Sequence, residues 1–270
     1  MPRPLYILKN VMEEDSTVTR EKIANLIGEL QNVSDKAYEY LAQYIRLLTK
    51  KDRANRVDRH TVDLGVRIWN DLKVTSELTK NGFYLQAMMV VRDAIEAMAL
   101  TEYLHSFPND ALAWWKAETK KERLRFSINN IKDKIEDGQE WKDIWDWLSL
   151  YIHTNSKATP VYGADKPYYG HNLFLGGFYY PESVEFLFRL QLLLCIEFLK
   201  RMTNWYKNEP EFTNKLLMDT DSLKGEYDIQ VNYFKGRVES ESKEVVGKVI
   251  STRLSKDKVI ELFRLLDNVR

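Results

Sequence analysis

Cysteine is almost absent from this 270-residue chain, which contains only Cys195. A single cysteine excludes a disulfide within the chain and any zinc site built from several thiolates. The four histidines, His60, His105, His153 and His171, are scattered and form no metal-binding motif. Glycine-rich phosphate loops and dinucleotide fingerprints are also missing. We therefore expect no metal and no cofactor.

Net charge and long apolar runs are missing as well. The chain has 40 basic and 40 acidic residues, a balance that disfavours extended tracking of a nucleic-acid backbone. No apolar stretch approaches the roughly 20 residues of a membrane-spanning helix. Charges also appear too early at the N-terminus for a secretory signal. We expect a cytoplasmic protein that does not enter membranes.

The residues that are abundant predict a helical protein. Apolar residues make up 44% of the chain, enough for a large core, and recur at helical spacing through residues 19–206. Residues 83–104 and 182–206 are apolar on almost every side, as is typical of central, buried helices. We expect these two segments to form the centre of a bundle that amphipathic helices surround.

The predicted fold class is therefore mainly α. A helical bundle over residues 1–207 is followed by a small C-terminal α+β extension over residues 208–270. Strands are expected within residues 226–254, because apolar and polar residues alternate there with the period of a strand. The apolar members of the first alternating run are Tyr227, Ile229, Val231 and Tyr233.

A long segment, residues 154–180, has neither helical nor strand periodicity but is rich in glycine and aromatic residues. Loops of this length are usually functional or disordered, and disordered segments are poor in aromatics. We expect the segment to pack as a lid or pocket wall. The residues it would contribute to binding are Asn155, Tyr168, Tyr169, His171 and Tyr179.

Two charged residues lie four apart in the most apolar helix. Arg92 and Glu96 share one helical face, along which Tyr103 also lies. Because an isolated buried charge is costly, they should pair with each other or with a facing helix. The pair is either a structural ion pair or the lining of a polar pocket within the bundle.

Asp146, Ser149 and His153 form a second polar stripe, just before the long segment. The plainer interpretation is a solvated helical face. The alternative is a site in which His153 acts as an acid–base group. A serine hydrolase is excluded for Ser149, because the sequence shows no strained nucleophile turn around it.

Arg53 and His60, near the start of a helix, resemble the arginine and histidine motif of the HEPN superfamily. That resemblance implies a role of these two residues in RNA cleavage at a dimer interface. The chain departs from the superfamily pattern in two ways. It has Ala54 where a polar residue is usual, and its motif lies in an early helix, whereas the superfamily usually has it in a late one.

Residues 60–205 as a whole resemble an uncharacterised family of bacterial helical proteins that is distantly HEPN-like. The resemblance rests on Arg92-x3-Glu96 and on Leu148-Ser149 followed by His153. It implies an all-helical body in which these polar residues meet.

The function expected from the sequence is a binding module with a polar pocket under the aromatic segment. Tyrosines suit a stacked base of RNA or a nucleotide, and equally a protein partner or a second copy of the chain. The alternative is a HEPN-like ribonuclease in antiphage defence or a toxin role, with His153 or His60 as the acid–base group. The sequence leaves open whether the protein is an enzyme.

Overall fold

A computed structural model describes residues 17–50, 56–152 and 181–246. Helices make up 88% of the described residues, which include no strand, so the prediction of a mainly α protein is confirmed. No helix among them is long and apolar enough to cross a membrane. Residues 17–27 are helical and precede α2 (Leu30–Lys50), α3 (Arg56–Lys80), α4 (Tyr84–Ser106), α5 (Asp110–Trp115), α6 (Lys120–Leu124), α7 (Ile128–Ile131), the 3₁₀ helix η1 (Lys132–Lys134), α8 (Gly138–Ile152), α10 (Pro181–Trp205) and α11 (Pro210–Val246).

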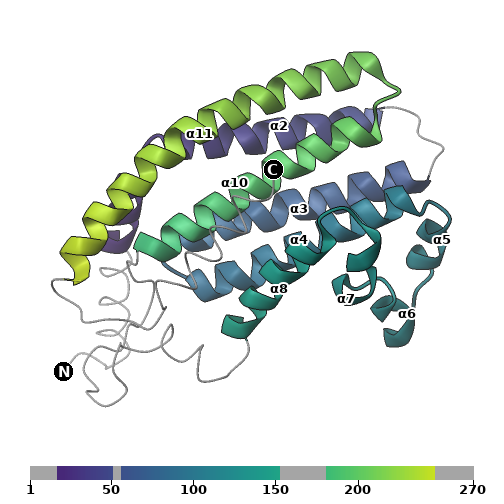
Figure 1. Cartoon of the computed structure of the whole chain (residues 1–270), viewed down its shortest axis with the longest axis horizontal. Helices are drawn as coiled ribbons and strands as arrows, with labels where there is room; N and C mark the ends of the chain where they lie inside the picture. The colour runs from purple at the N-terminus through teal and green to yellow at the C-terminus, as the bar shows by residue number, and fades with distance from the viewer. Residues whose placement is uncertain (1–16, 51–55, 153–180, 247–270) are drawn as a thin grey trace, which may run out of the picture.

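Helix α10 lies at the centre of the bundle (Figure 1). It packs against α2, α3, α4 and α11, while α8 covers the outer side of α4. The short elements α5, α6 and α7 gather beside one end of the bundle. The apolar character of α10 explains this position, because a helix without a polar face is stable only when it is covered all round.

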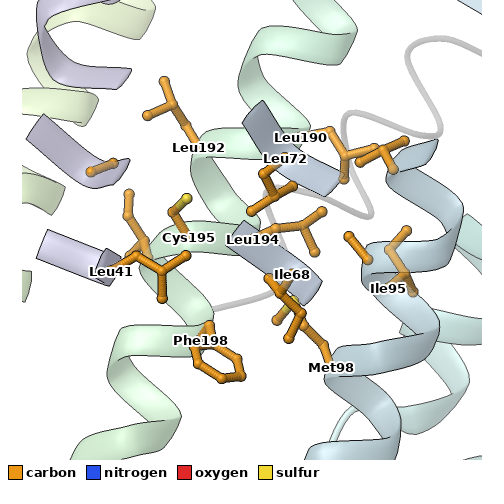
Figure 2. Packing of buried hydrophobic residues seen from close by; sticks show 14 of the residues in the cluster. Leu41, Ile68, Leu72, Ile95, Met98, Leu190, Leu192, Leu194, Cys195 and Phe198 are labelled. Carbon is orange, nitrogen blue, oxygen red and sulfur yellow. The ribbon is translucent and has the colours of Figure 1, made fainter. Parts of the chain in front are cut away.

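The core around α10 is continuous with that of its neighbours. Figure 2 shows Leu41 of α2, Ile68 of α3 and Ile95 of α4 among the apolar side chains of α10. Cys195 is completely buried in this cluster, and burial raises the pKa of its thiol. The lone cysteine is therefore a small apolar core residue.

Helices α3 and α4 form a tight antiparallel hairpin. The turn between them contains Gly82 with φ of 75°, a left-handed conformation that glycine adopts without steric cost. The Gly82 amide donates to the Thr79 carbonyl (3.0 Å) and the Phe83 amide to the Leu78 carbonyl (2.9 Å), which ends α3. This turn brings the start of α3 and the end of α4 to the same end of the bundle.

The strand predicted over Tyr227–Tyr233 is wrong, because these residues belong to the 37-residue helix α11. The buried residues there are Tyr227 and Val231, followed by Phe234 and Val238, which is helical spacing. Ile229 and Tyr233, which completed the alternating pattern, are 69% and 67% exposed. Packing of α11 on α10 and α2 selects the helical pattern.

Several predicted features lie outside the described residues. They are the aromatic segment at 154–180 and the part of the predicted α+β extension that follows residue 246. The predicted site residues that also lie outside the described ranges are Arg53, His153, Asn155, Tyr168, Tyr169, His171 and Tyr179.

The glycines provide a test of the helix packing. A methyl group at Gly225 or Gly236 of α11 would meet nothing within 4 Å, whereas one at Gly138 would overlap the backbone carbonyl of Lys132. We expect Gly225→Ala and Gly236→Ala each to raise the free energy of unfolding by about 1 kcal/mol. We expect Gly138→Ala to lower it by more than about 1 kcal/mol. Urea denaturation followed by circular dichroism measures all three, and a loss of stability in Gly225→Ala would contradict the exposed face of α11.

Candidate functional site

Arg92 and Ser149 lie together where α4 meets α8. The Arg92 guanidinium lies over the Trp145 ring, 4.5 Å from its centroid, and Nη1 donates to Ser149 Oγ at 3.4 Å. Ser149 Oγ in turn donates to the Trp145 carbonyl at 2.7 Å. Within the described ranges, Arg92 Nε is buried and has no hydrogen-bond partner. These contacts join α4 to α8.

Glu96 and Asp146 do not join this contact. In the described part of the chain, no hydrogen bond or ion pair links Glu96 to Arg92. Asp146 instead forms an ion pair with Lys142, which itself lies 5.2 Å above the Trp145 ring. Two cations therefore approach one indole, and of the two alternatives left open for Arg92, pairing with Glu96 or with a facing helix, the structure has the contact with the facing helix α8.

Tyr103 lies apart from Arg92 on the same helix. Eleven residues of helix separate them, which corresponds to about 16 Å. The Tyr103 hydroxyl donates to Asp110, and its ring packs on Phe107 at 4.8 Å. Burial raises the pKa of Tyr103, so the phenol stays protonated and serves to anchor α5.

His60 is enclosed by aromatic rings. It is 5% exposed, with the Trp114 ring edge-on at 4.8 Å and the Trp115 ring stacked at 5.6 Å. Burial lowers the pKa of His60, which favours a neutral ring at pH 7. In this position its ring packs α3 against α5.

The described residues form a cleft at the end of the bundle where α3 begins and α4 and α10 end, on the right in Figure 1. Its volume is about 310 Å³, and it opens to solvent. We call it the His105 cleft. Its lining consists of Val57 and Asp58 from α3, His105 and Pro108 from the end of α4, and Trp205, Tyr206, Asn208 and Glu209 from the end of α10.

Hydrogen bonds fix the tautomer of His105. Thr61 Oγ1 donates to the Val57 carbonyl at 2.8 Å and lies 2.7 Å from His105 Nε2. A hydroxyl has only one hydrogen, so Thr61 Oγ1 accepts from His105 Nε2–H. Burial lowers the pKa of His105 to about 4, and the ring is therefore neutral at pH 7. Nδ1 is left with a lone pair that accepts hydrogen bonds.

Trp205 holds the His105 ring in place from the other side. The two rings stack with centroids 4.3 Å apart and an interplanar angle of 4°. Trp205 Nε1 donates to Glu102 Oε2 at 3.0 Å, which fixes the indole. The site thus has a rigid aromatic wall.

A buried cation extends this network. Arg201 forms ion pairs with Glu102 at 3.2 Å and with Asp137 at 3.0 Å, and its side chain is only 7% exposed. Asp137 has φ of 53°, an unusual backbone conformation for a residue with a side chain. Arg201 therefore ties the turn before α8 to the end of α4, next to the His105 cleft.

Comparisons with known proteins identify no relative. No protein-family model, no curated protein and no solved structure matches the chain. Among the described residues, no group of histidine, cysteine, aspartate and glutamate side chains is arranged to hold a metal ion.

The site residues predicted from the sequence do not include His105, Trp205, Glu102 or Arg201. A signal was present, because His105 and Trp205 end the two most apolar helices. Helical periodicity says nothing of the relative direction of two helices, however. Only the packing of α4 with α10 shows that both ends meet.

The state of His105 predicts a dependence of stability on pH. A pKa of about 4 in the folded protein, against 6.5 ordinarily, means that the unfolded chain binds the proton more readily between these pH values. The free energy of unfolding should therefore fall as the pH drops from 6.5 to 4, by up to about 3 kcal/mol from this group. His105→Phe keeps a stacking ring and removes the titration, so its pH profile should be flatter. Urea unfolding at several pH values measures this. If the free energy of unfolding falls equally between pH 6.5 and 4 in the two proteins, the assignment is refuted.

The ion pairs of buried Arg201 predict that Glu102 contributes more to the free energy of unfolding than the exposed Glu77 does. Glu102→Leu leaves Arg201 and the Trp205 indole without their shared partner, and should lower the free energy of unfolding by about 3 kcal/mol. Glu77 pairs with Lys80 at 3.2 Å but is 65% exposed. Glu77→Leu is therefore the matched control, with an expected change below about 1 kcal/mol. Chemical denaturation measures both changes. If Glu102→Leu lowers the free energy of unfolding no more than Glu77→Leu does, the ion pairs of Arg201 contribute little to stability.

Proposed function

We propose that this chain is a binding module and that the His105 cleft is its ligand site. The observation that carries the proposal is the His105 ring itself, which is held neutral and in one tautomer beside a stacked indole. The fixed His105 ring keeps one hydrogen-bond acceptor, Nδ1, for a ligand. Little conformational entropy is lost when a ligand binds to a side chain that is already held in place.

The size and shape of the cleft favour a small ligand. Ligand pockets commonly have volumes of roughly 300 to 1,000 Å³, and about 310 Å³ is room for a compound with one ring. The lining combines flat apolar surfaces from Trp205, Tyr206 and Pro108 with a few polar groups. That combination is typical of sites that bind organic molecules.

Catalysis by the same cleft is disfavoured by its chemistry. A histidine whose pKa is about 4 is a weak base at neutral pH. The HEPN-like ribonuclease stays an alternative that rests on Arg53 and His153, outside the described residues, and on His60, which is buried. Four further expectations stay predictions: RNA binding, a role in antiphage defence, homodimer formation and a cytoplasmic location.

Three probes of one shape test the binding function. Benzamidine, benzamide and benzoate share a ring and differ in charge, and saturation-transfer NMR measures the binding of each. We expect at least one to bind, and Asn208→Trp, which places an indole in the cleft, to abolish that binding.

Asn214→Trp is the matched control, because Asn214 is an exposed residue of α11 that does not line the cleft. It should bind like the unmodified protein. If no probe binds, or if Asn208→Trp binds as well as the control, the proposed site is wrong.

A further inference from the structure

A small polar cluster lies inside the apolar core, where α2, α3 and α10 pack against one another. Its members are Ser34 and Tyr38 of α2, Ser76 of α3 and Gln191 of α10. All four side chains are buried, Ser34 and Gln191 completely so. Polar groups at such depth normally have hydrogen-bond partners, because a group that gives up water and finds no partner destabilises the fold.

The Tyr38 hydroxyl is the group that the other members of the cluster surround. It donates to Gln191 Oε1 at 2.7 Å and lies 3.3 Å from the Leu72 carbonyl oxygen. Burial raises the pKa of Tyr38 well above its ordinary value, whereas the nearby hydroxyls of Ser34 and Ser76 act in the opposite direction. The phenol therefore stays protonated and has one hydrogen to donate.

The hydrogen bonds within the cluster do not satisfy all of its polar atoms. In the described part of the chain, Ser34 Oγ, Ser76 Oγ and Gln191 Nε2 are buried and have no hydrogen-bond partner. With the Gln191 amide turned over, its nitrogen could donate to Tyr38 while Tyr38 donates to Leu72, but the amide oxygen would then be unpaired. One end of the amide therefore lacks a protein partner in either orientation.

The three unpaired groups suit a water molecule. Water donates and accepts hydrogen bonds, and a buried water in a protein typically makes about three of them. The two serine hydroxyls can each donate or accept, and the amide adds a donor or an acceptor. Serine is also smaller than the leucine and isoleucine residues that fill most of this core, so two serines on neighbouring helices take up less of a closely packed interior.

We propose that one water molecule binds in the core between α2, α3 and α10, held by Ser34 Oγ, Ser76 Oγ and the Gln191 amide beside the Tyr38 hydroxyl. The inference is independent of the proposed binding function, because none of these residues lines the His105 cleft. The water joins one side chain from each of three helices. A polar network whose members are all satisfied favours a single arrangement of the helices that it connects.

A crystal structure of the unmodified protein tests the proposal directly. We expect electron density for one water within hydrogen-bond distance of Ser34 Oγ, Ser76 Oγ and the Gln191 amide. If the side chains are ordered and there is no density for a water between them, the proposal is overturned.

The sign of a stability change gives a second test, in solution. With the water bound, Ser34→Ala and Ser76→Ala each remove a hydrogen bond and should shift the unfolding equilibrium about fivefold toward the unfolded chain. If the hydroxyls are instead unpaired, removing them should stabilise the fold. Ser222→Ala is the matched control, because it makes the same change at an exposed position of α11 and measures the helix preference of alanine. Urea unfolding measures all three variants.

The comparison with this control decides the outcome. Ser34→Ala and Ser76→Ala should each be less stable than Ser222→Ala. If both are as stable as Ser222→Ala or more stable, the two hydroxyls hold no water and the proposal is wrong.

Discussion

The structure depends above all on the burial of α10. This helix has no polar side of useful width, so it can exist in water only if other helices cover it on every side. Helices α2, α3, α4 and α11 provide that cover, and the order of the remaining elements follows from it. The ends of α4 and α10 come together as a result, and the His105 cleft is formed where they meet.

One guanidinium then fixes the parts that apolar packing leaves free. Arg201 contacts Glu102 of α4 and Asp137, just before α8. Apolar contacts tolerate small sliding movements between helices, whereas two ion pairs from one side chain require a single register. Glu102 also accepts from the Trp205 indole, so the same carboxylate positions the aromatic wall of the cleft. Fold and site thus share a polar network of few residues.

The long helices could be predicted from sequence because their apolar residues recur at helical spacing. The error at Tyr227–Tyr233 has a physical cause. Two patterns overlap in that segment, one of period two and one helical, and only contact with α10 and α2 decides between them. The cleft could not be predicted, because it depends on the direction in which α10 runs beside α4, and no local pattern records that direction.

The burial of Cys195 has a practical consequence for handling the molecule. It is the sole thiol of the chain, it has no exposed surface, and its raised pKa keeps it protonated. A cysteine engineered onto the surface would therefore be the one position that a maleimide dye or spin label reaches in the folded state. Conversely, alkylation of Cys195 itself requires the helices around α10 to separate, so its rate reports how often the centre of the bundle opens.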